Sequence, residues 1–181
     1  MKQLKYVLIG LVSLMILLVL IGFLLPSKHQ VKETIVIDAP VSMVFEEVND
    51  FRQWSNWSPW QDKDPHAIIS YDGPASGVGS KMAWHSDNPK VGKGSQEIIA
   101  SKPNQYLKTV LKMVGWDTVS HGVWNFEELD LNKTKVTWEF QGQVGSNIFH
   151  KYMMMLFKPA LRKDYRTGLQ RLKSHVEQHH K

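Results

Sequence analysis

The side chains that could act as acids or bases are scattered, and no two of them form a recognisable catalytic pair. Glu97, His85, Asp117 and His121 are polar residues near the ends of predicted strands. A histidine or a carboxylate in such a place could transfer a proton to or from a substrate. No two of the four can be paired from the sequence, so we predict no catalytic residue.

Other chemistry-bearing motifs are missing from the sequence. The chain has no cysteine, which excludes disulfides, a thiolate nucleophile and cysteine-based zinc sites. His175 and His179 are four residues apart, but they stand in HVEQH rather than HExxH and no third ligand is evident. We therefore expect no metal and no cofactor. No G-x-S-x-G motif occurs, and the glycines of SGVGSK and VGKGS do not have the spacing of a phosphate-binding loop.

Aromatic side chains are the more informative feature, with seven tryptophans in 181 residues. Strand alternation places the aromatic and aliphatic residues of several predicted strands on one side and their polar neighbours on the other. The apolar side can be an ordinary packed core, or it can be the wall of a cavity for an apolar ligand. Our candidates for the cavity lining are Trp54, Trp57, Trp84, Met113, Trp124, Trp138, Met153 and Phe157.

Two short helices are predicted in residues 39–60. Apolar residues recur at i, i+3, i+4 and i+7 within 41–48, which indicates a helix with one apolar face that begins at Pro40. Asp50 can cap a second helix, which the residue before Pro59 ends. Neither helix can bury its apolar face alone. The β-rich remainder of the chain must supply the surface against which they pack.

Short apolar alternations separated by turn residues predict an antiparallel sheet. A first strand is expected at 31–37. Six further strands are expected at 67–71, 79–85, 93–101, 106–114, 118–129 and 135–144.

A closing helical region completes the chain. Ser146 could cap it, and Pro159 should kink or break it. Beyond Pro159, apolar residues repeat with helical spacing from Leu161 to Val176, which is typical of an amphipathic helix. The whole pattern predicts an α+β fold, in which a curved antiparallel sheet of about seven strands wraps around a long C-terminal helix.

Several segments resemble a known family. These are the AP…WSNWSPW segment, GSKMAWHSDNPKVGKGSQEII, KVTWEF and the helical FKPALRKDYRTGLQRLKSHVE. They look like the polyketide cyclase/dehydrase and lipid-transport-like family of the START-like (SRPBCC) superfamily, from about Val31 to Glu177. The resemblance implies a helix-grip fold with a cavity between sheet and helix. Some members of the superfamily catalyse cyclisation or hydrolysis, but no motif here carries that activity over.

The N-terminal segment predicts a membrane anchor. Residues 6–25 are twenty residues without a charge, and a helix of that length spans roughly 30 Å, about one bilayer core. The alternative is a cleaved signal peptide, but the apolar run is longer than usual and no small-x-small site precedes Pro26. We therefore expect a transmembrane anchor at 1–26, a short linker at 27–30, the START-like domain at 31–178 and a polar tail at 179–181.

The charges flanking the anchor favour one orientation. Lys2 and Lys5 precede the apolar run, which favours an N-terminus on the inside. Lys28 and Lys32 follow it and weaken this bias. We expect a single-pass protein whose domain lies outside the cytoplasm, in the periplasm if the source is a bacterium.

These features together favour a membrane-anchored domain that binds a lipid or another apolar small molecule without catalysis. One alternative is a cyclase, dehydratase or hydrolase acting on an apolar substrate, with His85 or Glu97 as acid or base. Another is a ligand-free, membrane-tethered interaction module. Nucleic acid is not an expected partner, because the tryptophans fall on the side predicted to be buried. The sequence identifies no protein partner.

Overall fold

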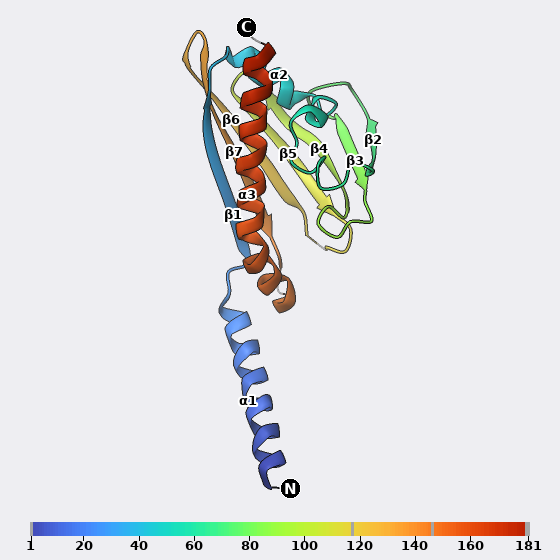
Figure 1. The fold of residues 1–181 in the computed structure, drawn as a ribbon, viewed down its shortest axis with the longest axis vertical. Helices are drawn as coiled ribbons and strands as arrows, with labels where there is room; N and C mark the ends of the chain where they lie inside the picture. The colour runs from blue at the N-terminus through green and yellow to red at the C-terminus, as the bar shows by residue number, and fades with distance from the viewer. Residues whose placement is uncertain (1, 117, 146, 180–181) are drawn as a thin grey trace.

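The computed structural model describes residues 2–116, 118–145 and 147–179, and its centre is a seven-stranded antiparallel sheet. Figure 1 shows one long helix lying across a face of this sheet and a second helix projecting from one end of the domain. The strands are arranged in the order β1-β7-β6-β5-β4-β3-β2. They are β1 (Lys28–Ile37), β2 (Ile68–Asp72), β3 (Lys81–His85), β4 (Lys93–Lys102), β5 (Tyr106–Met113), β6 (Ser120–Asp130) and β7 (Lys133–Gln143).

The first strand is longer than the sequence indicates. β1 begins at Lys28, three residues before the predicted start, so most of the expected linker 27–30 belongs to the strand. The cause is its partner, since β1 pairs with β7 from Lys28 opposite Gln143 to Ile37 opposite Thr134. The domain therefore begins almost directly after the N-terminal helix.

The two predicted helices after β1 are present, but the second is a single 3₁₀ turn. The helix α2 (Val41–Asn49) buries the expected apolar face, and the turn η1 (Gln53–Asn56) follows it. Asp50, predicted to cap the second helix, instead ends α2, and its Oδ1 accepts a hydrogen bond of 2.8 Å from the backbone N–H of Arg52, the N-cap residue of η1. A 3₁₀ helix has three residues per turn, so the three-residue spacing of Phe51, Trp54 and Trp57 suits it better than an α-helix.

The long helix α3 (Ile148–His179) continues through Pro159. Asn147 caps it, because its side-chain oxygen accepts hydrogen bonds from the backbone N–H groups of Phe149 and His150. The cap predicted at Ser146 lies outside the described residues. In Figure 1 the first turns, in orange, lie to one side of the axis of the later turns. A kink is one of the two effects predicted for Pro159.

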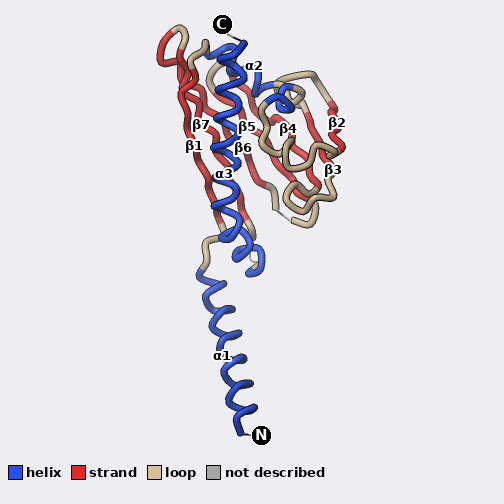
Figure 2. Tube along the Cα trace, viewed as in Figure 1, coloured by secondary structure: helices blue, strands red, loops and turns tan. Residues whose placement is uncertain are grey.

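The later turns of α3 pack on the sheet, as Figure 2 shows. Tyr165, Leu169, Leu172 and Val176 are buried there, as the helical spacing predicts. Residues before Pro159 behave differently, since Phe149 and Leu156 are 66% and 68% exposed. These first turns extend beyond the sheet and lie beside the end of the N-terminal helix.

The N-terminal helix α1 (Lys2–Leu24) lies apart from the core. Its segment Gln3–Leu24 is long and apolar enough to cross a membrane, and an 18-residue window within it has a mean hydropathy of 3.1. A signal sequence would have the same properties. Its end contacts α3, where the Tyr152 hydroxyl donates a hydrogen bond of 2.7 Å to the backbone carbonyl of Leu18.

Candidate functional site

A cavity of about 710 Å³ lies between the sheet and α3. This volume falls within the range of pockets that hold small molecules. Strands β2 to β7 supply one part of its wall, the segment around η1 a second part and α3 a third part. Aromatic and aliphatic side chains form most of that wall, including Trp54, Trp60, Met82, Trp84, Leu111, Met113, Trp138, Phe140, Met154 and Phe157.

The structure brings five of the eight candidate lining residues to this cavity. They are Trp54, Trp84, Met113, Trp138 and Phe157. The other three, Trp57, Trp124 and Met153, are not on its wall. In the run of three methionines it is Met154 that is buried and lines the cavity. Adjacent helical residues point in different directions, and the sequence did not show which methionine faces inward.

Trp57 and Trp124 belong to a packed aromatic cluster behind the cavity wall. Their side chains are 1% and 0% exposed, and the centres of their rings lie 5.8 Å apart. The ring of Trp124 stacks on that of Trp138 at 4.3 Å, and Trp138 stacks on Tyr165 at 3.9 Å. Edge-to-face and offset contacts of this kind stabilise beyond the area that they bury. Trp138 joins this cluster to the cavity, since it stacks on Trp124 and also lines the cavity.

A few polar groups interrupt the apolar wall. Tyr165, Gln96 and Thr109 line the cavity and are buried. Burial, and then the charge of Asp164, raise the pKa of the Tyr165 hydroxyl well above its usual value. The hydroxyl therefore stays protonated and can donate a hydrogen bond. Such isolated donors and acceptors can orient the polar end of an otherwise apolar ligand.

Charged residues gather on the part of the wall formed by residues 61–64 and by α3. The Lys63 ammonium pairs with the Asp164 carboxylate, and the Asp64 carboxylate accepts a hydrogen bond from the Ser86 hydroxyl. This hydrogen bond, and a second from the backbone N–H of His66, hold the pKa of Asp64 below its usual value. Asp64 is therefore an acceptor at neutral pH rather than a proton donor. Lys63, Asp64 and Asp164 therefore form a polar edge of the otherwise apolar cavity wall.

The acids and bases considered from the sequence do not face this cavity. Trp84 and Gln96 line it, so the strand neighbours His85 and Glu97 point to the opposite face. His121 does likewise, since Ser120 and Gly122 on either side of it line the cavity. Burial, and then the nearby Lys108, lower the pKa of His121. Asp117 lies outside the described residues. For His85, Glu97 and His121, the adjacent residue of the strand is the one that lines the cavity, so none of these three is placed to act on a ligand there.

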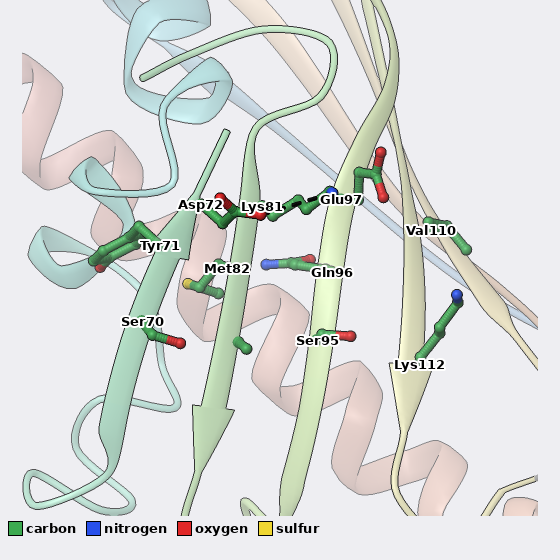
Figure 3. A pocket seen from close by; sticks show the side chains of 11 residues that line it. Ser70, Tyr71, Asp72, Lys81, Met82, Ser95, Gln96, Glu97, Val110 and Lys112 are labelled. Carbon is green, nitrogen blue, oxygen red and sulfur yellow. Dashed lines mark ion pairs between the residues drawn. The ribbon is translucent and has the colours of Figure 1, made fainter. Parts of the chain in front are cut away.

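Glu97 borders a second, smaller hollow of about 220 Å³ that spans β2 to β5 (Figure 3). Several of its lining side chains are charged or polar, among them Asp72, Lys81 and Lys112. Its volume is below the usual range of small-molecule pockets. The larger cavity is therefore the candidate site.

Within the described parts of the chain, no cluster of three or more histidine, aspartate or glutamate side chains is arranged to hold a metal ion. Sequence reasoning missed Trp60 and Tyr165 as lining residues. Tyr165 was assigned to the packed stripe of α3 by its spacing, which does not separate a core position from a cavity wall.

Comparison with known proteins agrees with this geometry. The family model described as polyketide cyclase / dehydrase and lipid transport matches residues 28–177. Among the curated proteins, none matches the chain.

Several solved structures have a similar fold. Zhui aromatase/cyclase from Streptomyces sp. R1128 is 13% identical, with a TM-score of 0.59 over 83% of this chain and 94% of that one. The Aha1 dimer from Colwellia psychrerythraea is 15% identical, with a TM-score of 0.58 over 82% and 96%. DynU16, a putative protein of the dynemicin biosynthetic locus, is 16% identical, with a TM-score of 0.57 over 82% of this chain but only 47% of its own. At such identities the likeness establishes the helix-grip fold alone.

Proposed function

Because this chain belongs to the polyketide cyclase/dehydrase and lipid transport family, we propose that its large cavity holds a lipid or another apolar small molecule beside a membrane. The observation that carries the proposal is the cavity of about 710 Å³ with a mainly aromatic and aliphatic wall. A volume of this size counts against a ligand-free interaction module, since pockets for small molecules begin at about 300 Å³.

The energetics favour an apolar occupant. Burial of each methylene group contributes about 0.8 kcal/mol, so an acyl chain or a polycyclic ligand gains enough from the wall alone. The buried Tyr165, Gln96 and Thr109 supply the hydrogen-bonding groups for one polar end. The ligand class that fits is therefore largely hydrocarbon with a single polar group.

Anchoring by α1 suits such a ligand. Apolar molecules partition into bilayers, so a tethered domain meets them at a raised local concentration. We propose that residues 1–26 form an uncleaved single-pass anchor with the N-terminus inside, so that the domain over residues 31–178 lies outside the cytoplasm. The α1 segment Gln3–Leu24, long and apolar enough to cross a membrane, supports the span, and Lys2 and Lys5 before it favour the orientation.

One observation favours a second candidate function, an enzyme that acts on an apolar substrate. Lys63, Asp64 and Asp164 place ionisable groups on the cavity wall. Asp164 is engaged by Lys63, and the lowered pKa of Asp64 disfavours it as a general acid. Under this alternative the ionised Asp64 would act as a general base, so Asp64→Asn would abolish turnover and leave ligand binding intact.

The experiment that tests the proposed function is native mass spectrometry of the full chain released from its own membrane, followed by organic extraction. We expect one defined apolar compound to accompany the protein in a stoichiometric amount. A clean apo mass, together with no uptake from lipid-containing micelles, would contradict the binding function.

A further inference from the structure

The first turns of α3 expose four large apolar side chains. Phe149 and Leu156 are 66% and 68% exposed, while Met155 and Phe157 are 51% and 49% exposed. The same helix after Pro159 buries its apolar residues against the sheet. Four large apolar side chains exposed within nine residues are unusual on a surface that faces water.

The contact between α3 and α1 places these turns at the depth of the membrane helix. The Tyr152 hydroxyl donates a hydrogen bond of 2.7 Å to the carbonyl of Leu18. Leu18 precedes the end of α1 at Leu24 by six residues, which is about 9 Å along a helix axis. If α1 spans a bilayer, the first turns of α3 therefore lie beside the last turns of its hydrocarbon-spanning part.

This contact is close and specific. A Cβ atom on Gly22 would approach Cγ2 of Ile148 to 2.2 Å, so the two helices touch where α1 has no side chain. Glycine contacts of this kind are typical of helices packed within membranes. The Lys151 ammonium donates to the backbone carbonyl of Phe23 at 3.4 Å, one of the last carbonyls of α1 that lack a helical partner.

The exposed apolar turns are continuous with the large cavity. Phe157 lines that cavity and is half exposed, and Val114 also lines it while being 73% exposed. Trp116, which follows β5, stacks on His150 of α3 with ring centres 4.6 Å apart. The rim of the cavity at Val114 and Phe157 therefore adjoins the same end of the domain as α1.

We infer that the first turns of α3 (residues 148–157) and the segment Val114–Trp116 are immersed in the lipid bilayer beside α1, so that the cavity rim opens into the acyl-chain region rather than into water. This inference rests on the proposed membrane anchoring and specifies the route by which an apolar ligand enters. It follows from the exposed apolar side chains together with the contact to Leu18. The immersed surface takes lipid acyl chains as its partner.

The chain lacks cysteine, so a fluorophore attached to a single introduced cysteine can report how deep that position lies in the bilayer. Phe149→Cys, Leu156→Cys and Phe157→Cys would each carry an environment-sensitive fluorophore in the full chain, reconstituted into nanodiscs of phosphatidylcholine and phosphatidylglycerol. Lipids with a spin label on the acyl chain serve as the quencher. Leu131→Cys is the matched control, because Leu131 is an exposed apolar residue in the β6–β7 turn, at the far end of the domain from α1. Leu14→Cys marks the middle of α1.

We expect the acyl-chain quencher to reduce the signals at 149, 156 and 157 severalfold more than the signal at 131. The inference would be overturned if the fluorophore at position 14 were quenched while those at positions 149 and 156 were quenched no more than the control at position 131. The anchor would remain in place in that case. Absence of quenching at 14 would overturn both the anchor and the inference. Ligand binding itself is measured separately in micelles, so its outcome does not depend on either result.

Discussion

Trp84 and Trp138 share the cavity wall, but they differ in what else depends on them. Trp138 is 2% exposed and stacks on both Trp124 and Tyr165. Trp84 is only partly buried and lies on β3 near the sheet edge. A charge at position 84 therefore enters the cavity without breaking the aromatic cluster.

We expect Trp84→Glu to weaken apolar ligand binding at least about tenfold, or 1.4 kcal/mol, because a carboxylate in an apolar wall loses its hydration without a partner. His85→Glu is the matched control, since the neighbouring side chain points away from the cavity. Titration of both folded proteins in micelles with a fluorescent fatty acid provides the measurement. Equal affinities would remove Trp84 from the binding wall.

Trp57 should behave in the opposite way. It is buried in the aromatic cluster and does not line the cavity. We expect Trp57→Ala to lower the free energy of unfolding by about 3–5 kcal/mol, the usual cost of removing a buried tryptophan. A Trp57→Phe protein that folds should bind ligand as the wild type does. Chemical denaturation followed by circular dichroism measures the first effect, and loss of affinity in folded Trp57→Phe would argue for a direct contact.

His29 gives the domain a pH dependence. Burial, and then the charge of Lys158, lower the pKa of His29 in the folded chain from its usual 6.5, although a hydrogen bond with the Pro26 backbone opposes the shift. The unfolded chain then binds the proton more readily, so stability is full above pH 6.5 and falls as the pH drops through the folded pKa. We expect His29→Gln to reduce this fall in a series of denaturation curves. An unchanged pH profile would show that His29 is not responsible.

At the scale of elements, the junction of α1 and α3 depends on Gly22. A methyl group there would collide with Ile148, whereas Gly10 has no atom within 4 Å of the corresponding position. We expect Gly22→Ala to loosen the first turns of α3, although alanine is the better helix former by about 1 kcal/mol. Gly10→Ala is the control, because it makes the same gain in helix propensity without the collision.

Hydrogen exchange of the nanodisc-bound protein distinguishes the two glycine variants. Faster exchange of the amides near residue 152 is expected in Gly22→Ala only. If both variants matched the wild type there, the contact between α1 and α3 would not hold these turns in place.

The sequence predicted structure correctly where a regular spacing of apolar residues reflects burial against a single surface. The alternation of the strands and the stripe of α2 each follow from burial against a single surface, and the seven-stranded sheet and α2 formed as predicted. The sequence was less informative for α3, whose later turns pack on the sheet while its first turns lie beside α1. Helical spacing indicated the buried face of α3 beyond Pro159, but no local pattern showed that Phe149 and Leu156 before it are exposed.

The candidate site shows the same limit. Alternation separates the two faces of a strand, but it does not separate Trp124 in the packed cluster from Trp84 on the cavity wall. That distinction depends on how far α3 stands from each strand, which no local pattern records. Five of eight candidates reached the wall because the cavity and the cluster share one aromatic face.

At the scale of the molecule, the helix that would enter the membrane lies at the same end of the domain as the cavity rim formed by Val114 and Phe157. Only three residues separate the end of α1 at Leu24 from the start of β1 at Lys28. If α1 spans a bilayer as proposed, a connection this short would hold the domain against it, where an apolar ligand would be exchanged. The sheet supplies the wall, α3 covers it, and the start of α3 adjoins α1.

The central claim is that the cavity between sheet and α3 holds an apolar ligand, and photolabelling tests it most directly. The full chain in nanodiscs would be irradiated with a diazirine-bearing fatty acid, and the adducts mapped by mass spectrometry of peptides. The account predicts adducts on the peptides that carry Trp84 and Met113, and their loss in Trp84→Glu. Adducts confined to α1 and the first turns of α3, with none on the strands of the cavity wall, would contradict it.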